Sequence, residues 1–207
     1  MNSAESAIAA VSILFMMLLL AAPALAGHEA GTVGPYIVSF DMNTTQEYKV
    51  IVEAATSGRT SLGVDYTRYN LTVDGTNYFV YLVLTKYSEP MVANETANAY
   101  VVLNALQNAG ADKPKLYKVA IDGQPGIVGN FRFENLYLGK GASQQGDLVV
   151  AACYSPDGKV SDDGVYRGET DCRVMSTYPW EIIRDFLNSL HVESPSVAGT
   201  QNSSSSE

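Results

Sequence analysis

Apolar and polar residues alternate over much of the chain, which is the pattern of β-strands with one buried face. Tyr36, Val38 and Phe40 share one face of the first such segment. An Asn-Thr-Thr turn at 43–45 separates it from a second segment at 47–52. The pattern predicts a β-hairpin over these two segments.

A second hairpin is expected from residues 64–73 and 78–84, which flank an Asp-Gly turn. Residues 78–84 are apolar on both faces, and this favours a central strand that is covered on both sides. Residues 116–121 and 127–138 form a third strand pair, joined by an Asp-Gly-Gln-Pro turn.

Two segments repeat with the period of an α-helix. The first has an apolar stripe and then a glycine at the position of a left-handed C-terminal cap: Ala99, Val102, Leu103, Leu106, Ala109 and then Gly110. The second begins at Pro179 and has an apolar side made of Trp180, Ile183, Phe186, Leu187 and Leu190. We expect Trp180, the only tryptophan, to anchor this second helix.

The order of strands, helix, strands and helix predicts one α+β domain over 35–192, with a mainly antiparallel sheet packed by two helices. A small linker at 27–34 precedes it in this interpretation. Inside the domain, a Gly-rich loop at 139–146 leads into a hairpin that carries both cysteines. The Ser-rich tail at 193–207 cannot bury enough apolar surface to fold and is expected to be disordered.

Residues 1–26 have the form of an export signal peptide. An apolar run over 7–22 is followed by Pro23 and by small residues at Ala24 and Ala26, which match an A-x-A cleavage site. We therefore expect cleavage after Ala26 and a secreted protein, extracellular or at the cell surface. No Lys or Arg precedes the apolar run, so an uncleaved membrane anchor is the alternative.

The net charge of −9 and the scatter of the 13 Lys and Arg residues argue against nucleic acid or an anionic lipid surface as a partner. Phosphate binding depends on clustered basic residues. After the signal, no segment approaches the roughly 20 apolar residues that cross a bilayer. The expected partners are other envelope or extracellular proteins, including a second copy of this chain.

The two cysteines belong to a chain that we expect to be exported, a setting in which thiols oxidise. Cys153 and Cys172 lie at equal distances from the turn at 162–163. Two strands reversing there would place them opposite each other, which predicts a disulfide. A bridge closing about 20 residues would stabilise the fold by roughly 3 kcal/mol. Two buried free thiols are the alternative.

Histidine-dependent catalysis lacks its residues. His28 and His191 lie at the two ends of the expected domain, so a Ser-His-Asp or Cys-His system has no base, and zinc or iron has too few ligands. No catalytic residue and no cofactor are therefore expected. The alternative is a small carboxylate-based enzyme acting on carbohydrate or another small extracellular substrate, with Asp65, Glu134 and Glu169 as candidate acids.

Acidic residues crowd the tip of the cysteine hairpin, where the candidate calcium ligands are Asp157, Asp162 and Asp163. Their spacing matches no calcium loop, and a solvated turn is the preferred explanation. Four N-x-[ST] triplets are candidate glycosylation sites: Asn43, Asn70, Asn94 and Asn202. Many of the 13 tyrosines fall on alternate strand positions. Core packing explains most of them, whereas an exposed row would form an interface or a carbohydrate-binding surface.

The opening strand at 37–41, the Ile121-Asp122-Gly123 turn after the internal helix and the helix end at 186–192 follow one another in an order and spacing that resemble the PsbP-like α/β sandwich family. The resemblance covers most of residues 35–192. It implies an extracytoplasmic accessory or binding domain, because the family is mostly non-enzymatic. The Tyr, Asn and Thr content also resembles uncharacterised exported proteins of methanogenic archaea. We therefore expect a non-catalytic extracellular or cell-envelope protein that acts by binding or assembly.

Overall fold

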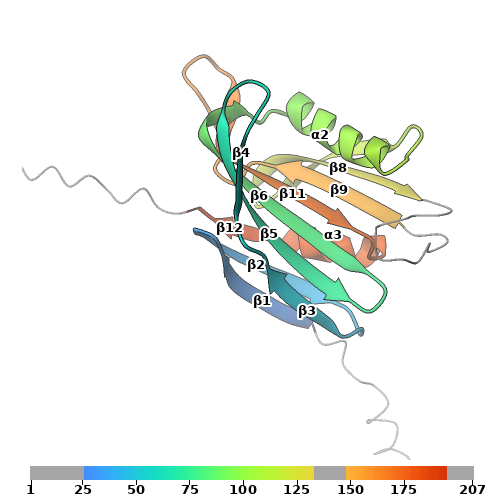
Figure 1. Ribbon diagram of the computed structural model, residues 1–207. Coiled ribbons are helices and arrows are strands. Elements are labelled where there is room, and N and C mark those ends of the chain that lie inside the picture. The colour runs from blue at the N-terminus through green and yellow to red at the C-terminus, as the bar shows by residue number, and fades with distance from the viewer. Residues whose placement is uncertain (1–25, 133–147, 195–207) are drawn as a thin grey trace, which may run out of the picture.

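The computed structural model describes residues 26–132 and 148–194 (Figure 1). In this part of the chain two antiparallel sheets and two helices form, so the expected α+β class is confirmed. The export signal, the Gly-rich loop, Glu134, Asn202 and nearly all of the Ser-rich tail lie outside the described residues. Within them, no helix has the length and apolar character to cross a membrane.

In the described residues the larger sheet has nine strands. Seven follow the order β3 (Tyr48–Val52), β5 (Asp65–Gly75), β6 (Phe79–Val92), β11 (Tyr166–Ser176), β9 (Leu148–Tyr154), β8 (Gln124–Arg132) and β7 (Lys115–Ile121). The short strands β4 (Thr56–Arg59) and β10 (Lys159–Val160) pair with β5 and β11. The smaller sheet has the order β1 (Ala26–Val33), β2 (Tyr36–Asn43) and β12 (His191–Glu193). The helices are α2 (Glu95–Asn108) and α3 (Trp180–Ser189).

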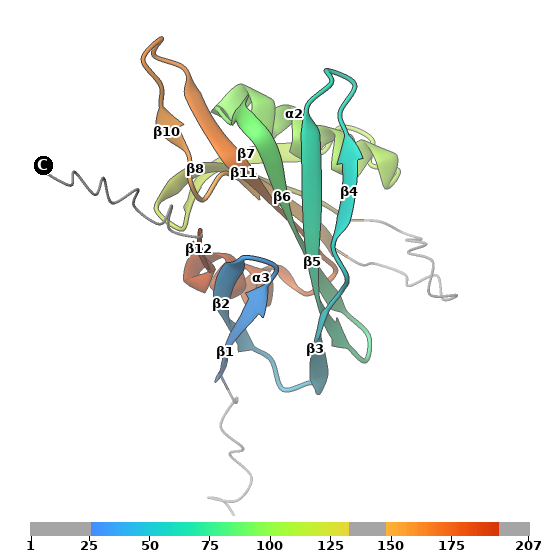
Figure 2. The same cartoon turned by 60° about the vertical axis from the view of Figure 1, so that its left-hand side comes forward.

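The larger sheet is the middle of three layers. Figures 1 and 2 show the smaller sheet and α3 on one side of it and α2 on the other. The main core lies between the larger sheet and the layer of β1, β2 and α3, and alternate residues of β2 point into it: Tyr36, Val38, Phe40 and Met42. A second, smaller core lies under α2, where Val102 and Leu106 pack on Ile127, Val149 and Ala151.

Helix α2 ends as expected at Gly110, and the structure adds a side-chain cap at its start. The Asn94 side chain accepts a hydrogen bond from the backbone N–H of Ala97 and caps the N-terminus. At the other end Gly110 has φ +97°, and its N–H donates to the carbonyl of Gln107. A glycine in the left-handed region closes a helix in this way without strain.

Phe186 anchors α3, and not Trp180 as expected. Phe186 is fully buried and its ring centroid lies 4.7 Å from that of Phe40 on β2. Ile183 is fully buried as well, whereas Trp180 is only half-buried at the margin of the core. Trp180 is the first residue of the helix, and it packs against the main core only in part.

The hairpins expected around 64–84 and 116–132 are confirmed. β5 pairs with β6, with Val73 opposite Val80. β7 pairs with β8 through a two-residue turn in which Asp122 and Gly123 both have positive φ, the geometry that suits the twist of a tight hairpin.

The hairpin expected from 36–40 and 47–52 is wrong. β2 belongs to the smaller sheet and β3 to the larger one, where Val50 pairs with Val73. The proposed linker at 27–34 is in fact strand β1, which pairs along the whole length of β2. Backbone hydrogen bonds to β2 hold this strand, because Val33 is the only buried hydrophobic side chain among its residues 27–33. The hydrophobic pattern therefore carries almost no sign of it.

The expected disulfide is absent, and both thiols are free and buried. The two strands are paired, but with a register that differs by one residue from the prediction: Cys153 lies opposite Arg173, and Cys172 opposite Tyr154. Successive side chains of a strand point to opposite faces. Cys172 therefore lies in the main core and Cys153 in the core under α2.

Candidate functional site

Helix α2 covers only part of its face of the larger sheet. It packs on β7, β8 and β9. Gly129 on β8 makes the close approach possible, because a Cβ there would lie 2.6 to 2.7 Å from side-chain carbons of Leu116, Leu106 and Val102. Beyond this contact, the outward residues of β6 and β11 are half-buried and face a groove beside the helix.

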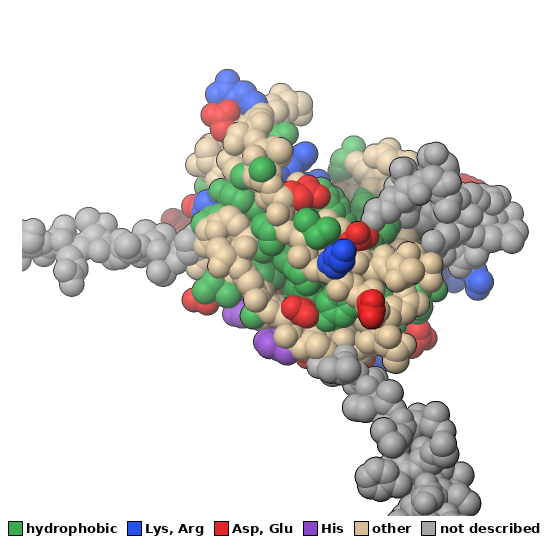
Figure 3. All heavy atoms as spheres, turned by 60° about the horizontal axis from the view of Figure 1, so that its bottom comes forward, with side chains coloured by type: hydrophobic (Ala, Val, Ile, Leu, Met, Phe, Trp, Pro, Cys, Tyr) green, Lys and Arg blue, Asp and Glu red, His purple; other side chains and the backbone are tan. Residues whose placement is uncertain are grey.

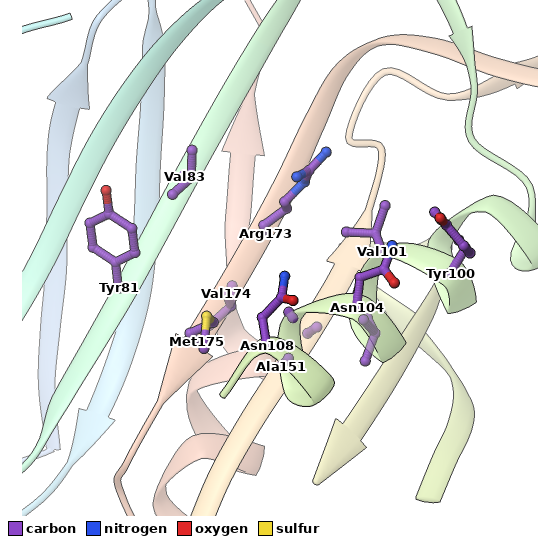
Figure 4. A pocket seen from close by; sticks show the side chains of 13 residues that line it. Tyr81, Val83, Tyr100, Val101, Asn104, Asn108, Ala151, Arg173, Val174 and Met175 are labelled. Carbon is purple, nitrogen blue, oxygen red and sulfur yellow. The ribbon is translucent and has the colours of Figure 1, made fainter. Parts of the chain in front are cut away.

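The groove has an apolar half of about 430 Å³ next to α2. Figure 4 shows Tyr81 and Val83 of β6 on one side, Asn104 and Asn108 of α2 on the other, and Arg173 of β11 between them. Most of the remaining wall is apolar: Val101, Val102, Ala105, Ala151 and Met175.

A polar half of about 370 Å³ adjoins it. Tyr81, Val83 and Arg173 line both halves, so the two form one continuous groove across the open strands. The polar half is completed by side chains of β4, β5 and β6: Thr56, Arg68, Asn70 and Thr85. Each half lies within the roughly 300–1,000 Å³ that is usual for small-molecule sites.

Two oxygens in the wall of the polar half have no hydrogen-bond partner among the described residues. They are Oδ1 of Asn70 and Oγ1 of Thr85, on side chains that are 9 % and 2 % exposed. The amide of Asn70 has one sensible orientation, because its Nδ2 donates to the Glu53 carboxylate at 3.2 Å and a carboxylate can only accept. Its Oδ1 is therefore a true unpaired acceptor, and buried groups of this kind cost about 1–3 kcal/mol.

The charges at the polar half are balanced. Nε of Arg173 donates to Asp171 at 2.6 Å, so this cation is neutralised inside the wall. The guanidinium of Arg68 lies 4.6 Å from the Tyr66 ring centroid, and the Glu53 carboxylate lies on the same strand face beside Asn70. Burial raises the pKa of Tyr81, Glu53 raises it further, and Arg68 opposes both. Arg68 and Glu53 thus act on the same hydroxyl with opposite signs.

The groove contains no recognisable base or nucleophile. The nearest thiol, Cys153, donates to Asp171 at 3.0 Å and lies 3.4 Å from Oδ1 of Asn98. Burial and the neighbouring Asp171 raise the pKa of this thiol well above its usual value, which keeps it protonated and unreactive. Tyr87 beside it also remains protonated, because burial raises its pKa to about 12.

The calcium candidates do not form a site. Asp157 accepts from the N–H and hydroxyl of Thr170 at 3.0 and 2.9 Å, and Asp163 accepts from Arg167 at 2.6 Å. These bonds hold the pKa of Asp163 well below its usual range. Asp162 is exposed at the turn. Over 26–132 and 148–194 no group of three or more His, Cys, Asp or Glu side chains could hold a metal ion.

Three candidate glycosylation sites lie in the described ranges, in different settings. Asn43 is exposed and its amide nitrogen donates to Asp185 of α3 at 3.2 Å. Asn94 is half-buried as the cap of α2. Asn70 is buried, and the nitrogen that a glycan would occupy is the one bonded to Glu53.

The carboxylates of the enzymatic alternative lie outside the groove. Asp65 pairs with Arg59 at 2.8 Å, and Glu169 with Lys86 at 2.6 Å. Neither lines either half of the groove. Each carboxylate is thus bound to a cation of a neighbouring strand and not aimed into the groove.

The two histidines acquire partners that the sequence does not indicate. Nδ1 of His28 lies 2.8 Å from Asp41 across the β1–β2 pair. Nδ1 of His191 lies 2.6 Å from Asp122, which also accepts from the N–H of Val192 at 2.9 Å. This contact attaches β12 to the β7–β8 turn. Hydrogen bonding to Asp122 raises the pKa of His191.

Charged side chains are scattered at the end of the molecule that carries β1 and β3. Figure 3 shows isolated basic and acidic side chains there, spread among apolar ones and not gathered into a patch of one sign.

Sequence reasoning missed the groove, although the alternating tyrosines were a usable signal, because Tyr81 lines both of its halves. Comparisons with protein-family models, with curated proteins and with solved structures found no match to this chain.

Proposed function

We propose that this chain is an exported, non-catalytic extracellular or cell-envelope protein, and that it acts by binding a molecule in the groove between α2 and the open strands. The export signal in the sequence supports the location. The observation that carries the binding role is the pair of unpartnered oxygens on Asn70 and Thr85 in the wall of the polar half, next to an apolar half. Binding sites characteristically combine apolar walls with a few convergent polar groups.

For the fold, we propose the PsbP-like sandwich. The order of strands, internal helix, hairpin and terminal helix supports it, as does the position of the helices on opposite faces of one antiparallel sheet. Such a domain is consistent with an accessory or binding role.

The binding role is tested with protein recovered after export and labelled for amide NMR. Three probes share an octyl chain and differ in the head: octyl β-glucoside, octanoate and octyltrimethylammonium, each below its micelle concentration. At least one of them should shift amide signals of α2, β6 and β11, the elements that form the groove.

Two matched variants of α2 show whether the groove itself is occupied. Asn104→Trp places an indole at a position that lines the groove, and Gln107→Trp places the same group on the exposed side of the helix. The first should abolish the shifts and the second should retain them. Absence of shifts with all three probes, or shifts that persist in Asn104→Trp, would refute the proposal.

A further inference from the structure

Resting on the proposed function, we infer that the ligand is an amphiphile with a neutral, polyhydroxylated head, such as a sugar, seated in the polar half and an apolar chain lying along α2. The polar half presents donors and acceptors side by side. Arg68 and Arg173 donate, Oδ1 of Asn70 accepts, and the hydroxyls of Tyr81 and Thr85 can do either.

The unpaired oxygens decide the kind of head. Oδ1 of Asn70 needs a donor, which a carboxylate or phosphate lacks. It also lies on the amide that is bonded to the Glu53 carboxylate, so an anion seated there would face a like charge. A quaternary ammonium head has no N–H to donate and would leave the same acceptor unpaired. A hydroxyl group both donates and accepts on one atom, and neighbouring sugar hydroxyls do so repeatedly.

The balance of charges in the wall of the polar half also favours a neutral head group. Arg173 is neutralised by Asp171, and Arg68 and Glu53 offset each other, so the polar half favours neither a cation nor an anion. The tyrosines fit as well: Tyr81 lies at the junction of the two halves, and Tyr100, 66 % exposed, stands on the helix side of the apolar half. Aromatic rings with a wet hydroxyl end suit surfaces that are partly apolar and partly polar.

The apolar half sets the rest of the ligand. Its apolar wall includes Val83 of β6, Met175 of β11 and the aliphatic side chains of α2. The helix also contributes two amide side chains, Asn104 and Asn108. A free sugar would leave this half empty. We therefore expect an alkyl chain attached to the head to contribute much of the affinity, in proportion to the apolar area that it buries.

The test measures dissociation constants for the same three octyl probes and for methyl β-glucoside. Octyl β-glucoside should bind at least about tenfold more tightly than octanoate or octyltrimethylammonium, and also more tightly than methyl β-glucoside, which lacks the chain. If octanoate or octyltrimethylammonium shifts the groove signals with equal or greater affinity, the head assignment is wrong while the binding role stands. If no probe binds the groove, both the inference and the proposed function fail.

Thr85→Val tests the contact itself. It replaces an unpartnered buried hydroxyl by a methyl group of the same shape, so the melting temperature should be unchanged or slightly higher. Affinity for octyl β-glucoside should fall about 3- to 10-fold, the range expected for one lost hydrogen bond. Thr72→Val, on the same strand face but outside the groove, should change neither value.

Arg68→Met is the second variant, because Arg68 is exposed and its replacement leaves the core intact. Like Thr85→Val, it should lower the affinity for octyl β-glucoside. A clear drop in the melting temperature of Thr85→Val would show that the hydroxyl has a structural partner, and full affinity in both Thr85→Val and Arg68→Met would show that the head does not occupy the polar half. Either result overturns the inference.

Discussion

Gly129→Ala is the substitution that most directly tests how α2 is held on the sheet. The added methyl carbon would lie 2.6 Å from Leu116, 2.7 Å from Leu106 and 2.7 Å from Val102. Carbon atoms attract at about 3.5–4.0 Å, so the helix would have to move outward by roughly 1 Å. Overpacking of this kind costs about 1–3 kcal/mol, and the lower entropy of alanine in the unfolded chain returns about 0.4–1 kcal/mol.

The expected net loss is therefore about 0.5–2 kcal/mol, which lowers the melting temperature of a chain of this size by roughly 1–8 °C. Gly31→Ala is the matched control, since it adds the same methyl group to strand β1 where no atom lies within 4 Å. It should melt at the wild-type temperature or slightly above. Calorimetry on the wild type and the two variants measures the difference. Equal melting temperatures of Gly129→Ala and Gly31→Ala would refute the view that Gly129 sets the distance of α2 from the sheet. Amide shifts along α2 should accompany the destabilisation.

Three further predictions concern the packing of α3, a terminal contact and the thiols. In urea denaturation, Phe186→Ala should lower the free energy of unfolding by about 3–5 kcal/mol, and Trp180→Ala should lower it clearly less. The reverse order would show that Trp180 is the anchor of α3. Because the pKa of His191 is raised in the folded state, its contact with Asp122 stabilises the fold fully below about pH 6.5. This contribution is lost as pH rises through the folded-state pKa. The melting temperature of His191→Gln should therefore lie below that of the wild type at pH 5.5, and the difference should shrink by pH 9. An equal deficit at both pH values would contradict this. Intact mass should not change on reduction, and Cys153 and Cys172 should react with an alkylating reagent only after unfolding; a two-proton increase on reduction would restore the disulfide.

The elements that the sequence predicted best are those in which local chemistry and burial agree. In helix α2, Val102 and Leu106 of the expected apolar stripe are buried, and Gly110 closes the helix as expected. The side-chain cap Asn94 is an addition that the structure reveals. The β7–β8 turn follows from Asp122-Gly123, where both residues adopt positive φ. In these segments the side chains that specify the conformation lie inside the element itself.

The errors come from segments whose conformation depends on distant partners. Strand β1 is polar and small along most of its length, and it exists because β2 offers an unpaired edge. The sequence could not show that residues 36–43 and 48–52 would enter different sheets, since a turn between two strands looks the same in either case. A one-residue shift of register between β9 and β11 was enough to place the two cysteines on opposite faces.

The existence of an open sheet face, by contrast, follows from simple geometry. An α-helix is about 10–12 Å across and covers two or three strands spaced about 4.8 Å apart. The main path of the larger sheet in the described residues has seven strands, and a single helix, α2, lies on its outer face. Much of that face must stay uncovered, whatever the sequence of the strands. Which strands remain open is decided by where the helix can approach most closely, and Gly129 puts that point on β8. The strands farther along the sheet, β6 and β11, are then left with Tyr81, Val83 and Arg173 facing outward, and these are the residues from which the groove is built.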